Sequence, residues 1–352
     1  MKTLVVGIAG TAKNTGKTTA LSALLAEIRQ RPEAPLPALT SIGYDGESFD
    51  NVTGLPKPRI EVAEGELLAV AERCLFSGSA ALEVIETTDI QTPLGKIALG
   101  RVTRPGKIVL AGPNNRRDLA RIISLFEEQN VPLAIVDGAL SRIAPLVLAQ
   151  ALLLCTGAAR HSDLDLLTEE TKLVVDLLKT PVLEERGRVL EPPSVLNQSG
   201  FDNFIAAVTN ADTIRLEGIF SQQYYPALAG QAKLLSGKRL IFSDSIKLML
   251  SGEAARTCGL LKRLRENGAE VGLARPSNLA AITVNPYYPK YRYDLKEYEA
   301  TYVDRDELLR RLSGCVEPVP CFDVVRQGGA PLYEALFNPS LFLFPANSCG
   351  RH

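Results

Sequence analysis

The stretch GTAKNTGKTT, residues 10–19, lies between the apolar run TLVVGIA (3–9) and the segment ALSALLAEIRQR (20–31). An apolar run of this length is typical of a strand buried on both faces of a sheet. After the turn, apolar residues recur at helical spacing before Pro32 ends the helix: Ala20, Leu21, Leu24, Leu25 and Ile28. The sequence therefore predicts a strand, a turn rich in glycine and threonine, and a helix in direct succession.

The turn carries most of the phosphate-binding pattern G-x-x-x-x-G-K-[ST]. Gly16, Lys17 and Thr18 supply its end, but the first glycine of the pattern would fall at Thr11 and instead lies one residue earlier, at Gly10. In such a turn the main-chain amides face an anion at the positive end of the following helix. We therefore predict a nucleotide-binding loop made of Gly10, Thr11, Lys13, Asn14, Thr15, Gly16, Lys17, Thr18 and Thr19.

Two side chains in this loop have chemistry suited to a nucleoside triphosphate. Lys17 carries an ammonium group that can reach the β- and γ-phosphates, so we predict a catalytic role for it. The Thr18 hydroxyl is suited to binding Mg²⁺. The alternative is an ordinary helix start, in which Asn14 or Thr19 caps the helix and both lysines lie in solvent.

A nucleotide-bound Mg²⁺ also needs a carboxylate. Asp137 ends the apolar strand PLAIVDG (132–138), at the edge of a parallel sheet where ligands bind, and we predict it as a catalytic and metal-binding residue. Asp45, in SIGYDGE (41–47), is a second metal candidate at the end of the strand predicted at 38–43. Both aspartates precede glycine, so an Asp-Gly turn is the alternative for each.

The composition places the chain among globular proteins of one or two domains. It has 352 residues, 46% of them hydrophobic, and a net charge of −1 without a strongly basic run, which argues against binding nucleic acid by bulk charge. No apolar stretch approaches the roughly 20 residues that span a bilayer, so we predict a cytoplasmic protein without membrane contact. Two histidines, and six cysteines without C-x-x-C spacing, favour reduced thiols over a zinc site or a disulfide framework.

Predicted strands and helices alternate along most of the chain, which implies a mostly parallel sheet. We predict an α/β fold of the P-loop NTPase type, with helices on both faces of the sheet and a β-hairpin insertion at about 82–104. Proline and glycine in 185–200 place a boundary between a nucleotide-binding domain, 1–190, and a second α/β domain, 195–352, that binds a partner or a substrate. A helix is also expected at 61–77, where apolar residues recur.

Three further strand ends are polar. In GPNNRRDL, Asn114, Asn115, Arg116 and Arg117 could bind an anionic or amide group, although a cap at Asn115 with solvated arginines is the favoured alternative. His161, in TGAARHSD, is expected to lie at the surface. Asn285, in TVNPYYP, could contact a base or a partner, although the rigidity that Pro286 imparts explains this segment equally well.

The form GTAKNTGKT resembles the GT-x-x-x-x-GK-[ST] loop of dethiobiotin synthetases and cobyrinic acid amide synthetases. IVDGALSR resembles the VEGAGG-type segment of the dethiobiotin synthetase group, with Asp in place of Glu. The resemblance implies the SIMIBI branch of P-loop proteins. In that branch an extra lysine reaches a partner subunit's nucleotide from one position before Lys13, so Lys13 has either this role or that of a solvated lysine.

The segments GTAKNTGKTT, LTSIGYDGE, IVDGALSR and TVNP together resemble the small subunit of the lysine 5,6-aminomutase reactivase group. That resemblance implies an ATP-dependent helper that acts with a MutS-like ATPase. Together they would restore a cobalamin-dependent aminomutase whose cofactor has been damaged. The chain departs from dethiobiotin synthetase in its hairpin and second domain, and it offers no Cys-His pair for the glutamine amidotransferase of the cobyrinic enzymes.

Three functions remain open from the sequence. The first is an ATPase that uses ATP and Mg²⁺ to act as a reactivase-type helper. The second is an ATP-dependent ligase of the dethiobiotin synthetase or cobyrinic amide synthetase type, in which Lys17 and Mg²⁺ stabilise phosphoryl transfer to a carboxylate or carbamate. The third is a domain that binds nucleotide without hydrolysing it. The chain has no guanine-reading NKxD segment, which favours adenine, and a homodimer is a candidate assembly.

Overall fold

The computed structural model describes residues 2–43, 59–139, 144–192, 198–276, 278–294 and 296–337. The chain forms two compact units. The first combines Met1–Leu167 with Asn278–His352, and the second is the continuous segment Thr168–Ser277. Each unit is built on a sheet of its own, so the protein is of the α/β class with one large and one small sheet.

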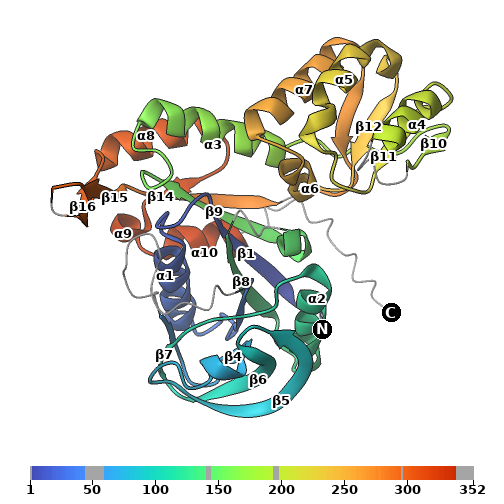
Figure 1. The fold of residues 1–352 in the computed structure, drawn as a ribbon. Coiled ribbons are helices and arrows are strands. Elements are labelled where there is room, and N and C mark those ends of the chain that lie inside the picture. The colour runs from blue at the N-terminus through green and yellow to red at the C-terminus, as the bar shows by residue number, and fades with distance from the viewer. Residues whose placement is uncertain are drawn as a thin grey trace. The chain divides into compact units, whose positions relative to one another are not determined.

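The sheet of the first unit has nine strands in the order β17-β14-β9-β1-β8-β2-β4-β6-β5 (Figure 1). Every pair from β17 to β4 is parallel, whereas β6 and β5 add an antiparallel hairpin at one edge. The strand bounds are β1 Leu4–Gly10, β2 Ala38–Ser41, β4 Leu67–Ala71, β5 Ala81–Thr92, β6 Gly95–Arg104, β8 Leu133–Ala139, β9 Ala151–Gly157, β14 Leu279–Asn285 and β17 Cys321–Phe322. The sheet is therefore mostly parallel, with the predicted hairpin at its end.

The middle of this sheet is apolar because its strands have neighbours on both sides. β1 pairs with β8 and β9, and Val6 and Ile8 of β1 are fully buried. Helix α1 (Lys17–Gln30) follows β1 and buries the five apolar residues expected from its periodicity. It packs against α9 (Val324–Gln327) and α10 (Ala330–Phe337) (Figure 1). The predicted strand, turn and helix at residues 3–31 are confirmed.

The helix predicted at 61–77 is wrong. The structure instead has β3 (Ile60–Val62), β4 and the short 3₁₀ helix η1 (Glu72–Cys74). All five residues of β4, LLAVA, are buried, and a short apolar run of this kind fits a strand covered on both faces as well as it fits a helix. β3 pairs with β7 (Gly106–Ile108) in a separate two-stranded sheet.

The second unit has four parallel strands in sequential order, β10-β11-β12-β13. Along these strands alternate residues enter an apolar core with an aromatic centre that includes Phe201, Phe204 and Phe220. The bounds are β10 Val189–Leu190, β11 Thr213–Leu216, β12 Arg239–Phe242, β13 Glu270–Leu273, α4 Gln198–Val208, α5 Tyr225–Gly230, α6 Ser245–Leu250 and α7 Ala254–Glu266. Helix α3 (Leu164–Leu178) begins in the first unit and continues into this one.

The last part of the chain departs from the predicted domain order. β14 lies beside β9, and β17 lies beside β14, so the chain returns to the first unit after the small sheet is complete. The boundary predicted at 185–200 is not where the units divide. Backbone pairing holds β14 in place, and an apolar strand such as LAAITVN does not encode which sheet it will join.

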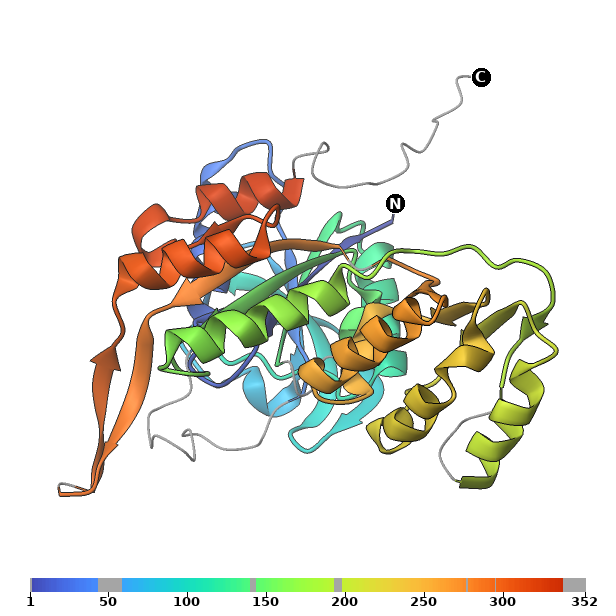
Figure 2. The same ribbon diagram turned by 90° about the horizontal axis from the view of Figure 1, so that it is seen from above.

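A hairpin and two further helices also belong to the first unit. The hairpin of β15 (Tyr287–Arg292) and β16 (Glu297–Tyr302) follows β14 and forms a two-stranded sheet of its own. Figure 2 shows this hairpin extending away from the large sheet. Helix α8 (Arg305–Val316) comes next and buries Leu308 and Leu312 against α3 and β14 residues of the same unit. Helix α2 (Arg116–Glu128) precedes β8.

No helix within the described ranges is both long and apolar enough to cross a bilayer. The cysteines in these ranges, Cys74, Cys155, Cys258, Cys315 and Cys321, are free thiols, as expected.

Candidate functional site

The turn between β1 and α1 has a backbone shape suited to an anion. Asn14 and Gly16 have positive φ angles of 62° and 89°, in the left-handed region. Gly16 is the N-cap of α1 and provides no side-chain hydrogen bond, and the first turn of the helix contains no acidic residue. The capping alternative, through Asn14 or Thr19, is therefore not what this turn adopts. The amides at the positive end of α1 are left without a side-chain acceptor.

Gly10 is required because the Lys17 side chain lies directly over it. A Cβ atom at Gly10 would lie 2.8 Å from Lys17 Cγ and Cδ and 2.8 Å from Thr15 Oγ1. The lysine stem thus folds back from the start of α1 toward the end of β1. The charge at the end of this stem acts on the Asp137 carboxyl of the neighbouring strand.

Thr11 and Thr15 hold the loop in place. The Thr11 amide donates to the Cys155 carbonyl (2.9 Å), and its hydroxyl bonds Thr156 Oγ1 (3.0 Å), which fastens the loop to the end of β9. Thr15 Oγ1, which is buried, donates to the Ala12 carbonyl at 2.9 Å. Threonine at position 11, where the general pattern has glycine, therefore contributes a bond that glycine could not make.

Asn285 is a site residue whose position the sequence alone did not establish. Its Nδ2 donates to the Asn14 carbonyl at 2.7 Å, while its Oδ1 accepts from the Tyr287 amide at 3.2 Å. The strand β14 carries Asn285 to the loop although 271 residues separate it from Asn14. The contact is close on the other side as well, since a Cβ at Gly157 (φ 154°) would lie 2.0 Å from the Asn285 carbonyl oxygen. The only sequence signal was the polar end of the segment TVNP.

Asp137 lies on the neighbouring strand, opposite Ile8 of β1 and Ser41 of β2. The residue keeps some exposed surface, but its Oδ1 is buried and has no hydrogen-bond partner among the described residues. Burial raises the pKa of the Asp137 carboxyl above its usual value, and the Lys17 ammonium and the Gly138 amide oppose that rise. A buried carboxylate oxygen without a donor is rare in native proteins and calls for a ligand or an ion.

Asp137 and Thr18 are the residues that could hold a divalent cation. Within the described ranges no group of three or more His, Cys, Asp or Glu side chains gathers. A protein-only metal cage is thus absent from these ranges, whereas Mg²⁺ is commonly held by one or two protein oxygens together with phosphates and water. Thr18 is half-buried in the first turn of α1. The third predicted ligand, Asp45, lies outside the described residues.

The remaining polar strand ends have simpler roles. Asn115 accepts from the Asp118 amide at 2.9 Å and caps α2, as expected, and the neighbouring Arg116 is exposed. His161 is half-buried in the loop that follows β9. Lys13 is exposed in the turn.

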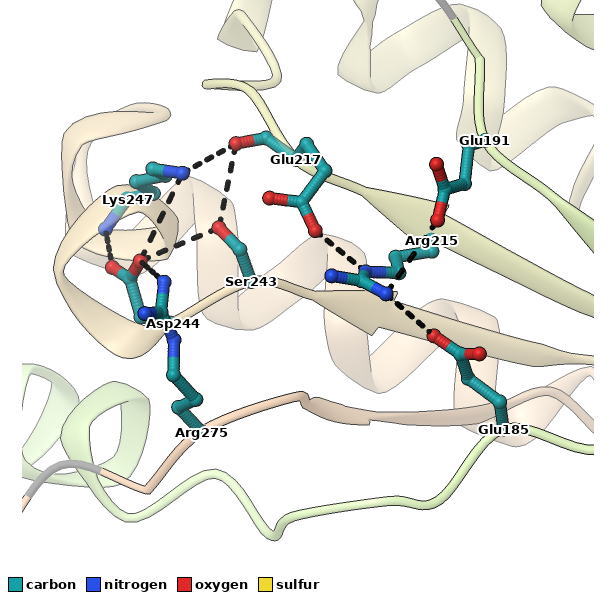
Figure 3. Close-up of polar contacts among 8 residues, drawn as sticks. All are labelled: Glu185, Glu191, Arg215, Glu217, Ser243, Asp244, Lys247 and Arg275. Carbon is teal, nitrogen blue, oxygen red and sulfur yellow. Dashed lines mark hydrogen bonds and ion pairs between the residues drawn. The ribbon is translucent and has the colours of Figure 1, made fainter.

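A second polar cluster lies at the carboxyl edge of the small sheet (Figure 3). Asp244, which is 95% buried in the side chain, caps α6 through the Lys247 amide (2.8 Å) and lies 3.6 Å from Arg275. Arg215 contacts three glutamates, Glu185, Glu191 and Glu217. Every cation in this network already contacts a carboxylate, so it is satisfied internally. The turn after β1, with its orphaned oxygen, is the stronger candidate.

Comparisons of the chain with models of protein families, with curated proteins and with solved structures found no match. The assignment of the site therefore depends on the geometry of the turn and of its neighbours.

We expect Asp137→Asn to stabilise the chain at pH 7 when nucleotide and divalent cations are absent. The folded-state pKa lies above the unfolded value of about 4, so the stability is greatest below that value and is lost as pH rises through the folded pKa. The amide has the same shape without the buried charge. The free energy of unfolding in urea should therefore rise by more than about 0.5 kcal/mol, the usual range for surface changes.

Asp176→Asn, at an exposed position of α3, is the matched control and should leave the stability within that range. The gain from Asp137→Asn should shrink as the pH falls toward 4, because a carboxyl with a raised pKa takes up its proton in the folded state before it does so in the unfolded chain. An Asp137→Asn chain less stable than the parent at pH 7 would contradict this reading.

Proposed function

We propose that the chain is an Mg²⁺-dependent ATPase that binds ATP in the turn between β1 and α1. The observation that carries the proposal is the buried Asp137 Oδ1 on the strand beside β1, which has no hydrogen-bond partner in the part of the chain that the structure describes. The charge of Lys17 acts on this carboxyl, and Lys17 is the first residue of α1, whose start has no side-chain cap. A negative group with a divalent cation, such as the phosphates of Mg·ATP, complements this combination of amides, ammonium and carboxylate.

The roles of the residues follow from their places in the turn. The amides of the turn and of the first turn of α1 would bind phosphate oxygens, and Lys17 would neutralise the β- and γ-phosphates. Thr18 and Asp137 would hold Mg²⁺, which when bound neutralises the charge that develops as the phosphoryl group is transferred. Asn285 and Thr11 keep the turn in its binding shape through their bonds to Asn14 and β9. Asn285 would therefore be a positioning residue, which affects nucleotide binding by holding the loop at Asn14.

Among ATPases of this kind, we propose a helper rather than a ligase. The resemblance of four segments to the small subunit of the lysine 5,6-aminomutase reactivase group supports a cobalamin-dependent aminomutase and a MutS-like ATPase as partners. The second unit, a complete α/β body of its own, has no obvious place in a ligase of the dethiobiotin synthetase type. That ligase reaction remains the alternative.

We expect Lys17→Ala to abolish ATP binding in isothermal titration calorimetry, because the turn loses the ammonium group whose aliphatic stem lies over Gly10. Lys17→Met keeps an apolar stem over Gly10 and should fail to bind as well, which separates the loss of charge from the loss of packing. Thermal unfolding should show that both variants are folded. If either binds ATP like the parent, the loop assignment is wrong.

Asn285→Ala should weaken Mg·ATP binding several-fold, because the turn loses its bond to β14, and should cost about 1 kcal/mol of stability. Asn278→Ala, directly before β14, is a matched control, since Asn278 Nδ2 donates to the Gln150 carbonyl at 2.8 Å. It should lose similar stability and keep the parent affinity. Equal losses of affinity in the two variants would mean that Asn285 has no special link to the site.

The helper and ligase reactions differ in what releases ADP. A helper should show weak ATPase activity that rises when the purified aminomutase and MutS-like ATPase are added, and that is indifferent to small carboxylic acids. A ligase should release ADP only when its carboxylate or carbamate substrate is present. A coupled ADP assay with each partner, and separately with a panel of mono- and dicarboxylic acids, distinguishes them. Stimulation by an acid and by no protein would refute the helper reading.

A further inference from the structure

The β15–β16 hairpin has two chemically different faces. Residues alternate between the faces of a strand, and the register pairs Tyr287 with Tyr302 and Tyr291 with Tyr298. Tyr293, at the tip, lies in an edge contact with Tyr291 at 4.9 Å between ring centroids. One face of the hairpin therefore has tyrosine at four of its six paired positions, and Pro289 and Ala300 occupy the other two. We call the five tyrosines the tyrosine face.

The rings of the tyrosine face contact one another edge to face. Tyr287 and Tyr302 lie 5.7 Å apart, and Tyr291 and Tyr298 lie 5.1 Å apart, with the planes of each pair inclined by more than 60°. These contacts are the arrangement that aromatic quadrupoles favour. They order the rings in advance, so that little side-chain entropy remains to be lost when another surface binds.

The tyrosine face is exposed although it is apolar. Tyr293 is 85% exposed and Tyr302 is 61% exposed, while Tyr291 and Tyr298 each keep about 40% of their surface. At about 200 Å² per ring, these four residues expose about 450 Å². An isolated two-stranded hairpin is at most marginally stable in water, and an apolar patch of this size matches the largest patch of a typical monomer, which is often functional.

The opposite face of the hairpin is polar and balanced in charge. The register places Lys290 opposite Glu299 and Arg292 opposite Glu297. Arg292 also bonds Glu299 at 3.0 Å and Asp294 at 2.9 Å. The opposite charges of this face therefore balance, and the hairpin neither repels its own copy nor selects a strongly acidic or basic partner.

We propose that the tyrosine face is the surface through which two copies of this chain associate. A tyrosine offers both a positive ring edge and a negative ring face, so a row of tyrosines is complementary to a second copy of itself. Two such faces would bury about 900 Å², which lies in the class of weak, transient interfaces. The neutral charge of the hairpin removes the repulsion that would otherwise oppose pairing of identical surfaces.

Sedimentation velocity over a range of concentrations, with and without Mg·ATP, tests this. The full chain should show concentration-dependent dimers under at least one of these conditions. The double variant Tyr293→Ser, Tyr302→Ser should raise the dissociation constant by about tenfold or more, because two ring contacts are lost. Tyr293→Phe with Tyr302→Phe keeps the rings and should still dimerise.

The matched control is Lys290→Ser with Glu299→Ser, which changes two residues of the hairpin on its other face and keeps the net charge. It should dimerise like the parent. A parent chain that stays monomeric under both conditions overturns the proposal, as does association that the serine variants of Tyr293 and Tyr302 leave unchanged. These results do not depend on ATP binding, which the Lys17 variants test separately.

Discussion

The site depends on one backbone constraint, the left-handed conformation at Asn14 and Gly16 in the turn that joins β1 to α1. In that conformation α1 begins without a side-chain cap at Gly16, and the Lys17 stem lies over Gly10. Glycine adopts such angles without a steric penalty, whereas asparagine tolerates them at modest cost. The bond from Asn285 to the Asn14 carbonyl helps to hold the less favourable of the two residues in place.

The same region combines local strain with a buried charge. Asp137 is destabilising as an isolated carboxylate, because burial raises its pKa and its Oδ1 lacks a donor. Proteins retain such groups where a ligand or an ion compensates for them, so stability and function oppose each other at this position. The second unit shows the contrast, since its charged residues at the strand ends are paired with one another (Figure 3).

The β15–β16 hairpin after β14 also combines a fixed base with groups that are left exposed. Its root is fixed by the pairing of β14 with β9 and by the bond from the Val303 amide to the Pro286 carbonyl (3.0 Å). Beyond that root the two strands form a two-stranded sheet of their own, and Tyr291, Tyr293, Tyr298 and Tyr302 are exposed. A segment that is rigid at its base and apolar at its exposed face is suited to bind another protein surface.

The sequence by itself determined the local elements: the strand, turn and helix at the start of the chain, the hairpin at 82–104 and the cap at Asn115, because hydrophobic period and turn chemistry act within a few residues. It misread 61–77, since a short apolar run fits a strand or a helix. Only the tertiary structure decided that β14 joins the large sheet and brings Asn285 to Asn14. Pairing between strands far apart in the chain depends on which edges are available, and no local pattern encodes that choice.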